Sequence, residues 1–275
     1  MDKKTESILI LWDFSKSCEI SLLHAIQLHK VVENKIILLY IIPSGGLFSN
    51  KSKIESQKKE AINKLKSIAE KTFNENKVKP EIIVEDGNVS KIIKKIMDKI
   101  NTNLIIMGES FKLSSSTYSF KDILKATENY NIPVIMTTLP PTHTHYSEIV
   151  VPLDHHKKYK EKLHWIIFLS KYYNFNINII KPYVSDELLK KQMANNVFFT
   201  KKMLDNKKIV YGIKTAKKTE SFPDAIQKFT KDIEADLIVV MISEFNSYIA
   251  NKNKSKAPVM CMTPRTDLRK FGGFN

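Results

Sequence analysis

Acidic, hydroxyl and cationic side chains stand at two places where apolar runs of the sequence end. Asp13 and Ser15 follow an apolar run near the start of the chain, and Lys112 and Ser114 follow another run that ends at Gly108. Hydroxyl donors beside an ammonium group could hold a small anion, and a solvated polar loop explains the same residues equally well. The acid could equally begin a helix as its N-cap, and Ser15 or Ser17 suits that position too. Both interpretations stay open on the residues alone.

Four histidines stand close together in the sequence, at His143, His145, His155 and His156. A His-x-His pair in a loop can ligate zinc or copper. No cysteine or carboxylate cluster with ligand spacing accompanies the group. We therefore expect surface histidines and no metal site.

The sequence holds no recognisable catalytic constellation. It contains no G-x-S-x-G elbow, no HExxH, no CxxC and no carboxylate pair at catalytic spacing. His24 and His164 have apolar neighbours and are expected to pack helices. We expect no catalytic residue and no cofactor.

Composition describes an ordinary globular protein of about two domains. The chain has 275 residues, of which 43% are hydrophobic and 27% are charged. Its longest apolar runs are far shorter than the ~20 residues that cross a membrane as a helix. The first residues are polar and do not form the core of a signal peptide. We expect a cytoplasmic protein without a membrane partner.

The net charge of +15 raises nucleic acid as a partner. Almost all of the positive charge is lysine, however, since arginine occurs only at Arg265 and Arg269. Proteins that recognise phosphates and bases favour arginine, so we expect a solvated lysine surface and no specific nucleic-acid binding. Cys18 and Cys261 fit small core residues in a reducing compartment better than a disulfide.

Two kinds of apolar pattern follow each other in turn along the first half, and they predict strands and helices in regular succession. Short continuous apolar runs predict buried parallel strands, and apolar residues at helical spacing between them predict helices. This βαβαβαβαβ order indicates a doubly wound α/β domain. The expected strands are at residues 8–12, 36–42, 80–84, 104–107 and 133–137, and the expected helices fall between them.

Pro140 and Pro141 mark a linker, after which the pattern repeats. The second half repeats the first apolar run with its terminal acid at Asp154, and it repeats the last two strands at residues 236–241 and 258–263. We expect two tandem five-stranded domains, at residues 1–141 and 146–266. Ligands of such sheets bind beyond the carboxyl ends of the strands, here at residues 13–17, at 41–46 and from Gly108 onward.

Four segments together resemble a universal stress protein domain. They are Trp12-Asp13-Phe14-Ser15, Glu85-Asp86-Gly87, Leu104-Ile105-Ile106-Met107-Gly108 and Pro133-Val134-Ile135-Met136. The resemblance implies a Rossmann-like fold of the adenine nucleotide alpha hydrolase type, with strand order 3-2-1-4-5. It also implies that the fifth strands, at residues 133–138 and 258–263, pair within the chain as a pseudo-dimer, and a homo-oligomer is possible.

Members of the family that bind ATP carry G-x2-G-x9-G-[ST] after the fourth strand. Here Gly108 matches the first glycine, but Phe111 stands at the second and Phe120 near the third. The resemblance places adenine near Ile41 and gives Asp13 a hydrogen bond to the ribose or adenine. Bulky rings where backbone amides would enclose a triphosphate indicate a degenerate ATP site.

The second half departs further from the nucleotide pattern. We align Ser243 with Gly108, so the segment to Pro258 spans 15 positions, against 25 from Gly108 to Pro133. Neither Ser243 nor any residue between it and Pro258 is glycine. The C-terminal domain is therefore expected to bind no nucleotide.

The sequence thus predicts a non-enzymatic stress-response protein of universal stress protein type. It would act through an unidentified protein partner or a small ligand other than ATP. The alternative is a stress sensor that binds ATP or AMP through Asp13, Ser15, Ile41, Gly108, Lys112 and Ser114 of the N-terminal domain only. A slow ATPase is a further version of that alternative.

Overall fold

The computed structural model divides into two compact units, Met1–Pro141 and Thr142–Asn275. The structure describes residues 6–43, 51–113, 116–117, 120–130, 132–155, 160–170, 174–242, 244–245 and 256–262.

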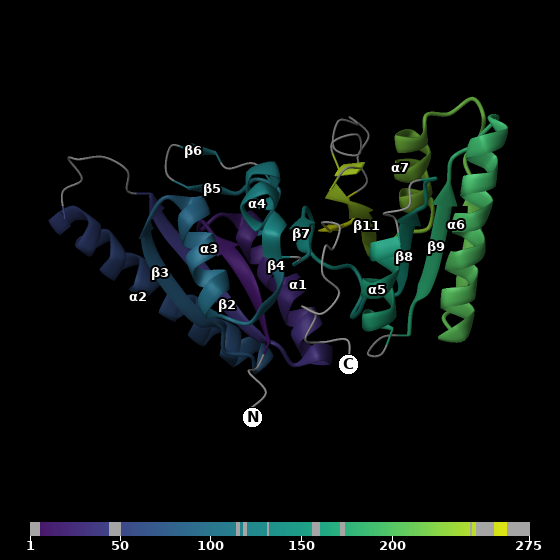
Figure 1. The fold of residues 1–275 in the computed structure, drawn as a ribbon. Helices are drawn as coiled ribbons and strands as arrows, with labels where there is room; N and C mark the ends of the chain where they lie inside the picture. The colour runs from purple at the N-terminus through teal and green to yellow at the C-terminus, as the bar shows by residue number, and fades with distance from the viewer. Residues whose placement is uncertain are drawn as a thin grey trace. The chain divides into compact units, whose positions relative to one another are not determined.

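The N-terminal unit is built on a five-stranded parallel sheet in the order β3-β2-β1-β4-β7. Every residue of β1 is buried, because helices cover both faces of a parallel sheet (Figure 1). A separate two-stranded antiparallel ribbon, β5 with β6, follows β4. The strands are β1 (Ser7–Trp12), β2 (Lys35–Pro43), β3 (Glu81–Gly87), β4 (Thr102–Gly108), β5 (Lys112–Leu113), β6 (Ser116–Thr117) and β7 (Val134–Thr137).

Local hydrogen bonds and backbone conformation explain where helices of the N-terminal unit begin and end. α3 begins at Asn88, whose side chain accepts a hydrogen bond from the Lys91 amide at 3.1 Å. α1 ends at Glu33, which takes the left-handed conformation with φ 56°. The helices are α1 (Lys16–Val32), α2 (Lys51–Asn76), α3 (Val89–Lys99), α4 (Phe120–Thr127) and the 3₁₀ turn η1 (Glu128–Tyr130).

The C-terminal unit has its own five parallel strands in the order β10-β9-β8-β11-β12. The side chains of Asp186 and Ser221 cap α6 and α7. The elements are β8 (Glu148–Pro152), α5 (Lys160–Leu169), β9 (Asn176–Lys181), α6 (Glu187–Asn206), β10 (Tyr211–Thr215), α7 (Phe222–Asp232), β11 (Leu237–Met241) and β12 (Val259–Met262).

The α/β fold expected from the sequence is confirmed, and each unit arranges its five strands in the same order. In the first half, all five expected strands and the helices between them are present. In the second half, the repeated patterns mark β8, β11 and β12, whereas β9, α6, β10 and α7 were implied by the expected repeat of a five-stranded domain but were assigned no residues. β5 and β6 were missed.

Candidate functional site

The Asp13 carboxylate lies at the carboxyl end of β1 and joins it to the segment after β4. Its Oδ2 accepts a hydrogen bond from the backbone amide of Lys112 at 2.6 Å. Its Oδ1 accepts from the Ser15 amide at 2.9 Å and from the Cys18 thiol at 2.8 Å. Both carboxylate oxygens are therefore engaged by the chain itself.

Ser15 occupies the N-cap position of α1, but its hydroxyl does not cap the helix. The hydroxyl instead lies 2.7 Å from the hydroxyl of Ser17. The interpretation of Asp13 as the N-cap is wrong, because Asp13 stands two residues before the cap and binds the amide of the cap residue.

Cys18 completes this cluster from the first turn of α1 as a buried, unpaired cysteine. Burial raises the pKa of its thiol, and the neighbouring Asp13 carboxylate raises that pKa further. The sulfur therefore stays protonated at neutral pH and serves as a hydrogen-bond donor to Asp13. A thiol of raised pKa is a poor nucleophile.

Gly108 ends β4 directly against α1. A Cβ at this position would lie 2.4 Å from Ser17 Oγ and 2.9 Å from the Ser17 backbone carbonyl carbon. Close packing of strand against helix thus requires a glycine here, whether or not a phosphate binds. The next position of the expected phosphate motif, Phe111, is 1% exposed, so its ring fills the core.

Three aromatic rings gather beside Asp13, which the sequence analysis did not foresee. Phe14 has a left-handed backbone with φ 62°, a strained conformation for a bulky residue. Its ring lies 4.8 Å from the ring of Tyr40 and 6.4 Å from that of Trp12, and Lys64 Nζ lies 5.8 Å from its centroid. The Trp12 indole nitrogen is buried, with no hydrogen-bond acceptor among the described residues.

The structure brings together four of the six residues predicted to bind a ligand. Asp13, Ser15 and Lys112 share one hydrogen-bond cluster, and Gly108 contacts its neighbour Ser17. Ile41 lies in β2 with its side chain buried in the core, and Ser114 falls outside the described residues. The arrangement can hold two chain segments together, and it leaves the Lys112 side chain exposed.

In the C-terminal unit, strand register places Met241 at the position of Gly108. Gly108 pairs with Thr137 in β7, and Met241 pairs with Met262 in β12. The alignment of Ser243 with Gly108 is therefore wrong by two positions. From Met241 to Pro258 there are 17 positions, so this segment is eight residues shorter than its counterpart of 25.

A buried ion pair lies at the carboxyl end of β8. Lys162 is fully buried, and its ammonium donates to Glu244 Oε1 at 2.8 Å and to the Pro152 carbonyl at 2.7 Å. Glu244 also accepts from the Met241 amide at 2.7 Å. Protein groups of opposite charge thus satisfy each other at this edge of the C-terminal sheet.

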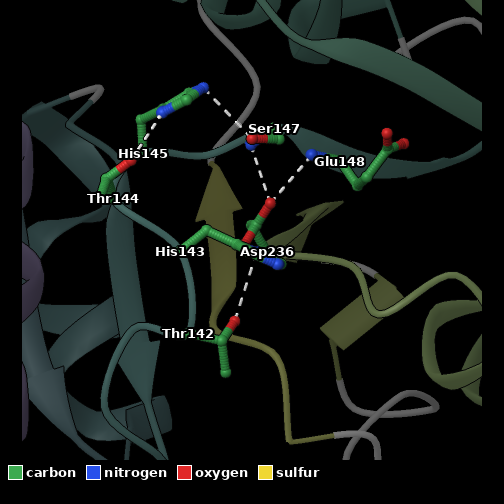
Figure 2. Close-up of polar contacts among 7 residues, drawn as sticks. All are labelled: Thr142, His143, Thr144, His145, Ser147, Glu148 and Asp236. Carbon is green, nitrogen blue, oxygen red and sulfur yellow. Dashed lines mark hydrogen bonds and ion pairs between the residues drawn. The ribbon is translucent and has the colours of Figure 1, made fainter.

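The two histidines nearest the linker contact polar groups of the protein (Figure 2). His143 Nδ1 lies 2.5 Å from Asp236 Oδ1, and Asp236 Oδ2 accepts from the amides of Ser147 and Glu148. The His145 Nε2 lies 3.2 Å from the Ser147 hydroxyl. Within the described part of the chain, no three His, Cys, Asp or Glu side chains are placed to hold a metal ion; His156 lies outside it.

The contact between Asp236 and His143 makes the stability of the C-terminal unit depend on pH. The hydrogen bond and charge of Asp236 raise the pKa of His143, and Glu234 and Glu148 add to the effect. The stabilisation is full below the unfolded pKa of about 6.5 and is lost as pH rises through the raised folded value. We expect His143→Gln to lower the melting temperature more at about pH 6 than at about pH 9.

The matched control is His145→Gln, because the nitrogens of His145 lie near the hydroxyls of Thr144 and Ser147. Differential scanning fluorimetry of both variants and the wild type at the two pH values measures the effect. An equal loss at both pH values for His143→Gln contradicts the expectation.

No helix in the described part of the chain combines the length and the hydrophobicity needed to cross a bilayer.

The parallel sheets, with polar groups at their carboxyl ends, define a Rossmann-like α/β protein. Residues 4–113 match the sequence model of the Universal stress protein family. The chain matches no curated protein.

Solved structures resemble both units. A universal stress protein from Archaeoglobus fulgidus DSM 4304 has a TM-score of 0.70 at 18% identity, over 95% of this chain and 97% of that chain. A functionally unknown protein from Pseudomonas aeruginosa PAO1 has a TM-score of 0.57 at 14% identity, over 94% of this chain and 92% of that one. At these identities the likeness is one of fold.

Proposed function

We propose that the chain is a non-enzymatic stress-response protein of universal stress protein type, built from two tandem copies of one domain. Its nucleotide site is degenerate, and it acts through a protein partner or a small ligand other than ATP. The match of residues 4–113 to the family and the shared strand order of the two units support this proposal.

The observation that carries the proposal is that donors of the chain itself bond both oxygens of the Asp13 carboxylate. A carboxylate offers about four acceptor positions, and donors of the chain already occupy two on Oδ1 and one on Oδ2, so little acceptor capacity remains for a ligand hydroxyl. The 2.6 Å bond to the Lys112 amide also holds the segment after β4 against the end of β1. The ring of Phe111 and the contact between Gly108 and Ser17 give the remaining motif positions structural roles.

The alternative is an ATP or AMP sensor that uses the N-terminal unit only. Two features favour it: the Trp12 indole nitrogen has no acceptor among the described residues, so a base could accept from it, and a phosphate could bind the exposed Lys112 side chain. In this version a ligand donor would either use the remaining acceptor position on Asp13 Oδ2 or displace one of the chain's own donors.

Calorimetric titration of the whole chain with ATP, AMP and cyclic AMP separates the two proposals. We expect no saturable heat below about 1 mM, which corresponds to a binding free energy weaker than about −4 kcal/mol. A micromolar dissociation constant contradicts the degenerate-site proposal.

Lys112→Ala is the variant to compare, because Lys112 bonds Asp13 through its backbone amide and the substitution leaves that bond in place. If the sensor alternative is right, Lys112→Ala weakens ATP more than AMP, because the side chain would bind the outer phosphates. Asp13→Ala is less informative, since it disturbs the fold as well as the site.

A further inference from the structure

β10 is the outer strand of the C-terminal sheet, and no strand in the described part of the chain pairs with its outer side. The Val210 carbonyl accepts from the Ile177 amide at 2.9 Å, and the Ala216 amide donates to the Lys181 carbonyl at 2.8 Å. Residues of a parallel strand bond alternately to the two sides. The backbone groups of the even-numbered residues between 210 and 216 therefore bond β9. The N–H and C=O groups of Tyr211, Ile213 and Thr215 point away from β9.

Most side chains of this strand are exposed as well. Gly212 to Thr215 are all exposed, and the apolar Val210 just before the strand is 62% exposed. A Cβ added at Gly212 would meet no atom within 4 Å, so that face of the strand is open. By contrast, six of the seven residues of β3, which ends the N-terminal sheet, are half-buried.

The two outer strands, β10 and β3, also differ in the charged residues around them. Residues 207–218 contain five lysines and no acidic residue. All five are exposed, and none forms an ion pair within the described part of the chain. Two of them lie over rings, Lys214 at 4.4 Å from Phe229 and Lys218 at 5.9 Å from Tyr183. In β3, the carboxylates pair with lysines: Glu81 with Lys35, Glu85 with Lys95 and Asp86 with Lys58.

We propose that β10 is a docking edge for an extended, acidic segment of a partner protein, which adds a strand beside Tyr211, Ile213 and Thr215. Backbone hydrogen bonds supply the affinity in this mode of recognition, and side chains supply the specificity. Here the carboxylates of the partner pair with the lysines of residues 207–218, and its apolar side chains cover Val210 and Ile213. The inference deepens the proposed function, on which it rests for the idea that the chain acts through a partner.

The test uses the full chain and a labelled peptide of about eight residues in which glutamate and valine alternate. Fluorescence anisotropy should show saturable binding of this peptide and none of the peptide with lysine in place of glutamate. Ile213→Pro removes an outward N–H while leaving the bonds to β9, since proline is tolerated at sheet edges. We expect it to weaken binding about tenfold or more.

Charge reversal at Lys207, Lys208 and Lys214 should weaken peptide binding by as much as Ile213→Pro does. The same reversal on α3, at Lys91, Lys94 and Lys99, is the matched control and should leave binding within about twofold of wild type. Should Ile213→Pro lose its fold, hydrogen exchange on the wild type decides. The amides of residues 211, 213 and 215 should become protected by the peptide, whereas those of 212 and 214 are protected already.

Three outcomes overturn the proposal. They are no binding of the acidic peptide, binding without protection of the outward amides, and tighter binding of a single-stranded RNA than of the peptide at the same lysines. The proposal is also overturned if charge reversal leaves peptide binding unchanged and causes aggregation, because the lysines then serve to prevent self-pairing of the edge. The nucleotide titration depends on the N-terminal unit, so its failure and the failure of peptide binding are distinguishable.

Discussion

Replacing Gly108 by alanine is expected to lower the free energy of unfolding of the N-terminal unit by about 3 kcal/mol. The added Cβ would lie 2.4 Å from Ser17 Oγ and 2.9 Å from the Ser17 backbone carbonyl carbon. The hydroxyl can rotate away, but the backbone of α1 can move only with the helix. Relief would therefore displace α1 from β4 and disturb the contacts of the adjacent Asp13.

Gly212→Ala is the matched control, because its added Cβ meets nothing within 4 Å. We expect that variant to be unchanged or up to about 1 kcal/mol more stable, since alanine loses less backbone entropy than glycine. Urea unfolding in a Trp165→Phe background, followed by Trp12 fluorescence, reports on the N-terminal unit. Far-ultraviolet circular dichroism follows both variants in the same background. A Gly108→Ala variant whose N-terminal unit is as stable as that of the wild type contradicts the packing role of Gly108.

Lys162→Met is expected to lower the free energy of unfolding of the C-terminal unit by about 3 kcal/mol. The variant removes the cation from a carboxylate that is only 21% exposed, and it leaves the Pro152 carbonyl without its donor. Adding Glu244→Gln should restore much of the loss. Glutamine removes the unpaired charge and still accepts from the Met241 amide.

The pair Lys190 and Glu187 in α6 is the comparison, because it has a similar separation of 2.6 Å but both side chains are exposed. Lys190→Met should change stability by less than about 0.5 kcal/mol. Chemical unfolding followed by circular dichroism measures all four proteins. A loss in Lys162→Met no larger than that in Lys190→Met contradicts the expectation.

The fold of the first half could be predicted because each buried strand is a continuous apolar run and each helix an amphipathic one. The elements of the second half that no pattern located lack these signals. β10 has two apolar residues among five and is exposed, so nothing in its pattern marks a strand. α6 has polar residues, Asn196 and Thr200, among its few buried positions, which obscures its periodicity.

The candidate site could be located from the sequence but not understood from it. The topological rule brought Asp13 and Gly108 to one edge of the sheet. The bond between Asp13 and the Lys112 amide joins positions 99 residues apart, and only the folded chain reveals it. The left-handed Phe14 and the contact between Gly108 and Ser17 also depend on tertiary packing. The pairing of the fifth strands stays a prediction.

The Asp13 bond has a consequence for how this region varies among related chains. Its far end is a main-chain N–H, which every amino acid except proline supplies. Position 112 can therefore drift freely in side chain while the link persists, and no correlated substitution with position 13 should arise. An analysis of coevolving residue pairs would therefore not detect this hydrogen bond. The bond would be visible in an alignment only as the absence of proline at position 112.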